Sequence, residues 1–274
     1  MTATLPIPAA AADPVTKPFI SVAGLTKRFN NGVTVLDNVS LDLVPGDFVS
    51  LIGPSGCGKS TLLKLVSGLS PVSGGSITVD GMTPNNAREV MSFIFQDATL
   101  LPWRTVIGNI ELGLELEGTA IATQRWSKAV ELLKLVGLSD VANHYPRQLS
   151  GGMKMRVSIA RALAIRPKLL LMDEPFGALD EMTRDYLNEE LLRLREEQKW
   201  TALFVTHSVA EAVFLSTRIV VLQAKPGRIR RDIPVPFPFP RLPHLRSDPA
   251  YLDVVGQVSQ ALRDMCVESR EARA

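Results

Sequence analysis

The chain has 274 residues, of which 46% are hydrophobic and 21% charged, a composition typical of a soluble protein with a sizeable core. The formal net charge of +2 is small and the lysines and arginines are dispersed, which argues against nucleic acid as the main partner. Two cysteines, Cys57 and Cys266, give no disulfide framework and indicate a reducing, cytoplasmic setting.

The N-terminal residues 1–18 contain neither a basic n-region nor a long apolar run. We therefore expect a disordered leader there, and neither a signal peptide nor an anchor. No apolar stretch of the sequence reaches the roughly 20 residues of a membrane span. Any membrane association is expected to come through a partner.

Short apolar runs alternate with turn signals between residues 20 and 51, which predicts several strands. The last run ends at a glycine-rich loop, and the residues after the loop have helical spacing. Residues 74–95 predict a strand, a turn and another strand, and a mostly helical block follows. The pattern as a whole predicts a doubly wound α/β core with an antiparallel β portion and a helical subdomain.

The C-terminal half begins with a fully apolar run at residues 169–172, which is typical of a buried parallel strand. A charged helix follows, in which Asp180 with Arg184 and Glu189 with Arg193 have the i,i+4 spacing of ion pairs. Two more strands are expected at residues 201–208 and 217–223. The tail from Tyr251 has apolar residues at helical spacing and predicts a closing helix.

The stretch GPSGCGKST, residues 53–61, fits the phosphate-loop pattern. Its glycines let the backbone N–H groups converge, and these donors together with the helix N-terminus form a phosphate site. Lys59 is expected to reach the β and γ phosphates of a nucleotide and Ser60 to ligate Mg²⁺. A plain glycine-rich turn is the alternative, which the strand before and the helix after disfavour. The expected nucleotide contacts are Gly53, Pro54, Ser55, Gly56, Cys57, Gly58, Lys59, Ser60 and Thr61.

Three polar residues are expected at the carboxyl ends of buried strands, where open α/β sheets bind ligands. Asp173 and Glu174 follow the run LLLM, and His207 follows ALFVT. Asp173 suits a contact to Mg²⁺, Glu174 a general base that polarises the attacking water, and His207 a γ-phosphate contact. A helix cap is the alternative for the acidic pair, and a structural role is the alternative for the histidine.

The sequence LSGGM at residues 149–153 resembles the signature motif of the ATP-binding cassette (ABC) ATPases. With the phosphate loop, Gln96, LLLMDEP, ALD at residues 178–180 and His207, it gives the motifs of that family in the family's order. The resemblance implies a P-loop ATPase domain over residues 19–250, with an antiparallel β subdomain and an inserted helical subdomain at about residues 97–165. A C-terminal helix and tail are expected over residues 251–274.

The family resemblance also implies a sandwich of two copies of the chain around ATP and Mg²⁺. Lys59 of one copy and Ser150, Gly151 and Gly152 of the other would enclose one nucleotide. Independently of the family, two glycines at a helix start far from the phosphate loop indicate a second anion site, which a head-to-tail pair would use. A serine-capped helix is the alternative; it explains Ser150 but not the two glycines.

Other residues take their expected roles from the resemblance alone. Phe29 would stack on adenine, with a core position as the alternative, because the family more often has tyrosine there. Gln96 would contact Mg²⁺ and water, and Asp180 would cross the dimer seam. Met153 replaces the usual glutamine of the signature motif. Independently of the resemblance, the place of Cys57 in the glycine loop leads us to expect that bulky thiol reagents reach it and inhibit ATP hydrolysis, and that ATP protects it.

The segment after Gln96 is unusually apolar and suits either core packing or a groove for a helix of a membrane subunit. Its LLPWRTV, with the sequence KPGRIRRDI at residues 225–233, resembles the nitrate, sulfonate and taurine branch of ABC importers; the charged RIRR also fits a solvated strand edge. The branch implies two permease subunits, a solute-binding protein and a place on the cytoplasmic face of the inner membrane. The alternatives are an ABC ATPase acting on nucleic acid or the ribosome and an exporter subunit.

Overall fold

The computed structural model describes residues 17–116, 118 and 121–271, with side chains as far as Met265. The first 16 residues of the expected leader lie outside the described residues. The side chain of Cys266 and the last three residues of the tail lie outside them as well.

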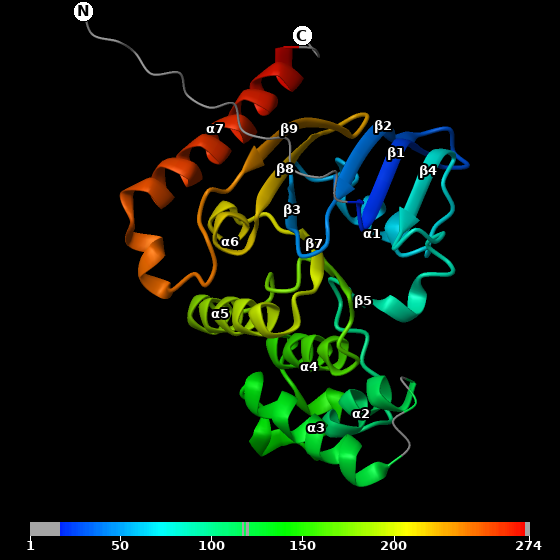
Figure 1. Ribbon diagram of the computed structural model, residues 1–274, viewed down its shortest axis with the longest axis vertical. Helices are drawn as coiled ribbons and strands as arrows, with labels where there is room; N and C mark the ends of the chain where they lie inside the picture. The colour runs from blue at the N-terminus through cyan, green and yellow to red at the C-terminus, as the bar shows by residue number, and fades with distance from the viewer. Residues whose placement is uncertain (1–16, 117, 119–120, 272–274) are drawn as a thin grey trace, which may run out of the picture.

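Two β-sheets occupy one end of the molecule in the described residues (Figure 1). The six-stranded sheet has the order β5-β6-β7-β3-β8-β9. Strands β5, β6, β7, β3 and β8 run parallel, and β9 pairs antiparallel with β8. Its strands are β3 (Phe48–Ile52), β5 (Met91–Ile94), β6 (Leu169–Asp173), β7 (Thr201–Val205), β8 (Arg218–Gln223) and β9 (Arg228–Pro234). The three-stranded antiparallel sheet, of order β2-β1-β4, consists of β1 (Ile20–Arg28), β2 (Thr34–Leu43) and β4 (Gly74–Val79).

The central strands β3, β6 and β7 are buried along their whole length, as an apolar run in a parallel sheet requires. Successive side chains of a strand point to opposite faces of the sheet, so each strand contributes side chains to the hydrophobic cores on both faces. In β6, Leu170 and Met172 belong to one hydrophobic cluster and Leu169 and Leu171 to the other. The second cluster also contains α1 (Lys59–Val66) and the inner side of the three-stranded sheet.

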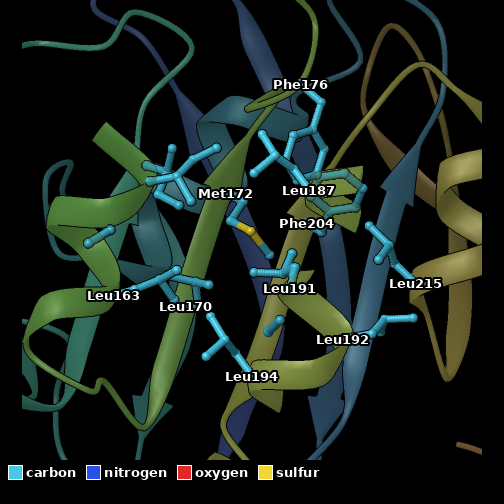
Figure 2. Close-up of a cluster of buried hydrophobic side chains, with 14 of the residues drawn as sticks. Leu163, Leu170, Met172, Phe176, Leu187, Leu191, Leu192, Leu194, Phe204 and Leu215 are labelled. Carbon is cyan, nitrogen blue, oxygen red and sulfur yellow. The ribbon is translucent and has the colours of Figure 1, made fainter. Parts of the chain in front are cut away.

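The first cluster lies under helices α5 (Glu181–Gln198) and α6 (Val209–Leu215). Figure 2 shows Met172 and Phe204 from the sheet together with Leu187 and Leu191 of α5. These buried leucines keep helical spacing, so one face of an otherwise charged helix covers the sheet. Helices on both faces make the core doubly wound.

A helical block lies at the other end of the molecule (Figure 1). Its helices are α2 (Val106–Leu116), α3 (Ala122–Leu135) and α4 (Gly151–Ala164), with the short 3₁₀ turns Ser139–Val141 and Pro146–Gln148 between α3 and α4. Another 3₁₀ turn, Arg88–Val90 (η1), directly precedes β5. The inner faces of the three helices join the first cluster through residues such as Ile110, Leu133 and Leu163. The block is therefore continuous with the core that supports the sheet.

The chain ends in a strap, residues 235–248, that includes a 3₁₀ turn (Pro243–Ser247) and leads into α7 (Pro249–Glu271). Arg241 in the strap is buried, and its guanidinium donates hydrogen bonds to the carbonyl oxygens of Val213, Phe214 and Phe237 at 2.7–3.2 Å. Burial lowers the pKa of Arg241 to about 10. The strap thus caps the last turn of α6 with a cation, which suits the negative end of a helix.

The sequence RIRR lies on β9, at the edge of the six-stranded sheet. Arg228, Arg230 and Arg231 are exposed there, which matches a solvated strand edge.

Candidate active site

The glycine loop between β3 and α1 needs glycine at both of its ends. Gly53 has a φ of +153° and Gly58 a φ of +97°. A Cβ on Gly53 would lie 2.3 Å from the carbonyl oxygen of Leu222, and a Cβ on Gly58 2.5 Å from Leu36 Cδ2. The packing of β8 and β2 against the loop therefore dictates glycine, and the loop delivers the chain to the N-terminus of α1.

Lys59 is the first residue of α1 and is almost wholly buried. Its Nζ donates hydrogen bonds to the carbonyl oxygens of Gly53, at 2.8 Å, and Pro54, at 3.3 Å. The ammonium therefore folds back over the loop that the sequence identified as the phosphate site. It supplies a fixed positive charge beside the free N–H groups of the helix N-terminus.

Ser60 and Asp173 meet across the sheet, although they are far apart in the sequence. Ser60 Oγ donates a hydrogen bond of 2.8 Å to Asp173 Oδ1. Asp173 ends β6 and is only 4% exposed, and burial raises the pKa of its carboxyl group. The hydrogen bond from Ser60 opposes that rise. A hydroxyl and a carboxylate side by side are oxygen ligands of the kind that a hard divalent cation prefers.

Glu174 and His207 also come together, at the carboxyl ends of β6 and β7. His207 Nδ1 lies 3.5 Å from Glu174 Oε2. Glu174 has a φ of +49°, which is an unfavourable conformation for a residue with a Cβ. Its N–H donates a hydrogen bond of 3.0 Å to the carbonyl oxygen of Val205, which helps to hold this conformation. The glutamate is partly covered, whereas most of the histidine side chain is exposed. Both side chains are thus available to a ligand at this edge.

The signature residues lie on the helical block and not beside the phosphate loop. Ser150 is the N-cap of α4, and its Oγ accepts a hydrogen bond of 3.3 Å from the N–H of Met153. A Cβ on Gly152 would lie 3.1 Å from Leu179 Cδ2, whereas a Cβ on Gly151 would meet nothing within 4 Å. The cap explains Ser150, the contact with Leu179 accounts for Gly152, and Gly151 leaves the helix N-terminus open.

Three further predicted residues are exposed at separate places. Asp180 is the N-cap of α5, where its Oδ1 accepts a bond of 2.9 Å from the N–H of Thr183, and this contact lowers the pKa of the carboxyl group. Gln96 lies in the loop after β5. Phe29 follows β1 and is 45% exposed, with Lys27 Nζ 5.3 Å from its ring centroid, so the core alternative for Phe29 is wrong.

The expected ion pairs of α5 differ from those in the structure. Asp180 caps the helix, and Arg184 instead lies 3.3 Å from Glu211 of α6. Arg193 pairs with Glu190 and Glu197, whereas Glu189 pairs with Arg246 of the strap. The i,i+4 spacing was misleading because capping and tertiary partners competed for the same side chains.

The accessibility expected of Cys57 is also wrong. The side chain is fully buried in the second cluster, and burial raises the pKa of its thiol. The turn directs the side chain inwards, and the residue as a whole is covered although it stands in the loop.

Sequence reasoning missed Thr206 and Glu211 on either side of His207. Both are buried, and Thr206 Oγ1 donates a hydrogen bond of 2.5 Å to Glu211 Oε2. The only sequence signal was a carboxylate within one helical turn of the proposed γ-phosphate contact.

Comparison with known proteins agrees with this arrangement. The family model described as "ABC transporter" matches residues 36–177. The chain belongs to the ABC transporter family. It is 45% identical to the aliphatic sulfonates import ATP-binding protein SsuB of Bacillus cereus, over 81% of this chain and 88% of that protein. It is 46% identical to the taurine import ATP-binding protein TauB of Rhizobium johnstonii, over 74% of this chain and 77% of that protein.

The fold agrees with a solved structure of an ATP-binding cassette, MJ0796, described as a dimer in a post-hydrolysis state bound to ADP and phosphate. The TM-score is 0.74 with 35% sequence identity, over 80% of this chain and 99% of the cassette. This confirms the predicted ABC ATPase fold class. As a member of the family the chain binds ATP and hydrolyses it.

In the part of the chain that the structure describes, no helix is long and apolar enough to cross a membrane.

The burial of Cys57 predicts that its thiol reacts slowly in the folded protein. Two variants in a Cys266→Ser background allow the comparison: one keeps Cys57, and the other carries Cys57→Ser together with Ser55→Cys at an exposed position of the loop. A bulky maleimide should modify Cys57 at least about tenfold more slowly than the cysteine at position 55, because the buried thiol stays protonated and covered. Mass spectrometry of timed samples measures both rates. Equal rates in the folded proteins would contradict the buried position.

Proposed function

We propose that this subunit energises an importer for small sulfonates or related oxyanions, and that it acts as a pair bound to two permease subunits. The observation that carries the proposal is 45–46% identity, over most of the chain, to proteins named for sulfonate and taurine import. The segments LLPWRTV and KPGRI, which suggested the same branch, support it. The pair of permeases places the subunit at the cytoplasmic face of the inner membrane, with a separate solute-binding protein delivering the solute.

The proposed chemistry begins with the phosphate loop. Backbone N–H groups at the start of α1 and the Lys59 ammonium would bind the β and γ phosphates of ATP. Glu174, partly exposed at the carboxyl end of β6, would accept a proton from the attacking water. His207, 3.5 Å from that carboxylate, would contact the γ phosphate and orient the glutamate.

The residues present also fit Mg²⁺. Ser60 Oγ and the buried Asp173 carboxylate adjoin each other, and Gln96 adds a side-chain amide oxygen on the loop after β5. When bound, the cation would neutralise charge on the phosphates. An ionised carboxylate that is buried without a cation costs free energy, and this cost favours binding at Asp173.

A pair of chains would complete each ATP site. The open N-terminus of α4, at Ser150 and Gly151, would meet the nucleotide held by Lys59 of the other copy. Asp180 is exposed close to that helix end in the fold, because Gly152 packs against the neighbouring Leu179. This position supports the expected role of Asp180 at the seam between the copies. Phe29, exposed after β1, is able to stack on the adenine.

The permease would dock on the apolar segment after Gln96 and the groove beside it. Trp103 is 71% exposed and Pro102 is exposed, so a core role for Trp103 is wrong. A groove of about 810 Å³ lies between the 3₁₀ turn before β5, strand β5, α2 and α4, and Phe93, Leu112, Leu116 and Ile165 line it. Such a groove suits a short helix with an apolar face.

The groove connects to the active site through Arg161 on its wall. The guanidinium donates hydrogen bonds of 3.1–3.2 Å to the carbonyl oxygens of Ala98 and Thr99, in the loop that carries Gln96. A partner in the groove would therefore act on the backbone next to the proposed Mg²⁺ ligand.

The assignment of Glu174 as the base predicts that Glu174→Gln keeps ATP binding but lowers hydrolysis by about 10²-fold or more, because the amide cannot accept the proton. Equilibrium binding of ATP and phosphate release measure the two properties separately. Wild-type turnover in this variant would reject the assignment.

The docking surface predicts that Trp103→Ala changes the free energy of unfolding by less than about 1 kcal/mol, against the roughly 3–5 kcal/mol of a buried large aromatic. Copurification with the permease should be lost, since an aromatic anchor contributes about 2 kcal/mol or more to an interface. Trp126→Ala, at an exposed tryptophan of α3 that lies outside the segment LLPWRTV, is the control and should still assemble. Unimpaired assembly of Trp103→Ala would contradict the docking site.

The proposed solute class predicts the phenotype of a strain that lacks the gene. Growth should fail when taurine or an alkanesulfonate is the sole sulfur source and persist on sulfate, and the wild-type gene should restore it while the Glu174→Gln variant should not. Growth on sulfonates without the gene, together with failure on nitrate as nitrogen source, would assign the transporter to a different oxyanion.

A further inference from the structure

A partly buried arginine and a buried glutamate connect two functional segments that the sequence places far apart. Arg184, in the first turns of α5, donates a hydrogen bond of 2.9 Å from Nη2 to the carbonyl oxygen of Leu179. Leu179 immediately precedes Asp180, the residue proposed for the dimer seam, and contacts the position of Gly152. One end of the guanidinium is therefore bonded to the backbone immediately before Asp180.

The other side of the same guanidinium faces α6. Arg184 Nε lies 3.3 Å from Glu211 Oε1, an ion pair without an aligned hydrogen bond. Glu211 Oε2 accepts the 2.5 Å hydrogen bond from Thr206 Oγ1, and Thr206 Oγ1 accepts one of 3.0 Å from the N–H of Ser208. The Glu211 carboxylate is thus bonded to Thr206, the residue before His207. Thr206 is in turn bonded to Ser208, the residue after His207.

We propose that Arg184 and Glu211 are positioning residues, which hold His207 in a fixed relation to residues 178–180 so that closure of the dimer seam sets the γ-phosphate contact. The chain of contacts runs from the Leu179 carbonyl through Arg184, Glu211 and Thr206 to the backbone on both sides of His207. The inference rests on the proposed roles of His207 and Asp180.

The burial of this pair sets what happens when it is broken. The side chain of Glu211 is 8% exposed and that of Arg184 28%. Burial raises the pKa of Glu211, and the Thr206 hydrogen bond and the Arg184 charge oppose the rise. A buried carboxylate needs such partners, so its geometry is more closely fixed than that of an exposed ion pair. His207 itself is largely exposed, and its ring nitrogen Nδ1 lies 3.5 Å from Glu174 Oε2.

The test compares Glu211→Gln, His207→Ala and the double variant in steady-state ATP hydrolysis. Glu211→Gln keeps the side-chain volume but turns an amide towards Arg184, so kcat should fall about tenfold through misplacement of His207 while the Kd for ATP changes less than about twofold. The double variant should be no slower than His207→Ala alone, because both changes disable one unit. Glu197→Gln, which breaks the exposed pair with Arg193 on the same helix α5, is the matched control and should keep wild-type turnover.

A second route guards against loss of folding in Glu211→Gln, which a melting curve detects. Thr206→Val removes the hydroxyl at nearly constant volume and should reproduce the fall in kcat, whereas Thr206→Ser should restore it. Wild-type kcat in both Glu211→Gln and Thr206→Val, or a double variant that multiplies the two separate losses, would overturn the positioning role. Wild-type turnover in His207→Ala would reject the assignment of His207 itself and the inference with it. A fall in His207→Ala alone would refute only the inference.

Discussion

The hydrogen bond from Ser60 to Asp173 is the contact on which the site depends. It joins the start of α1, where the glycine loop presents its N–H groups, to the end of β6, where Asp173 leads directly into Glu174. Because Asp173 is buried and carries a raised pKa, its position is costly unless the hydroxyl and a bound cation compensate for lost water. This hydrogen bond therefore ties the phosphate loop to the strand end that carries the proposed base, in addition to the strand pairing and the hydrogen bond from the Glu174 N–H to Val205.

The two helix N-termini proposed to bind anions lie on different parts of the fold. The N-terminus of α1 belongs to the sheet core and that of α4 to the helical block at the other end of the molecule (Figure 1). The contact of Gly152 with Leu179 ties the second N-terminus to the segment that precedes Asp180. A head-to-tail pair explains why one chain carries two such sites, and the Arg184–Glu211 contact connects the same segment to His207.

Much of this could be predicted from the sequence, because local patterns fix it. Lys59 follows the glycine pattern of the phosphate loop and Asp173 follows an apolar strand run, and strand ends in a parallel sheet share one edge. The pairing of Arg184 with Glu211 could not be predicted, because the helical spacing favoured Asp180, whose carboxylate caps α5 instead. The direction of the Cys57 side chain could not be predicted from the sequence either, because it depends on how β8 and β2 pack against the loop. Local spacing indicates the candidate residues of the site, and tertiary packing decides their partners.

The central claim is that Lys59 of one copy and the Ser150 helix end of the other act on the same ATP. Mixing two inactive variants tests it most directly. Lys59→Ala and Ser150→Phe should each abolish hydrolysis in their own dimers, because every site then lacks one component. A mixed dimer would combine the intact Lys59 of one chain with the intact Ser150 of the other, so hydrolysis should reappear on mixing and rise with the fraction of mixed dimers. Mixtures that stay inactive, although mixed dimers are detected by mass spectrometry, would contradict the shared site.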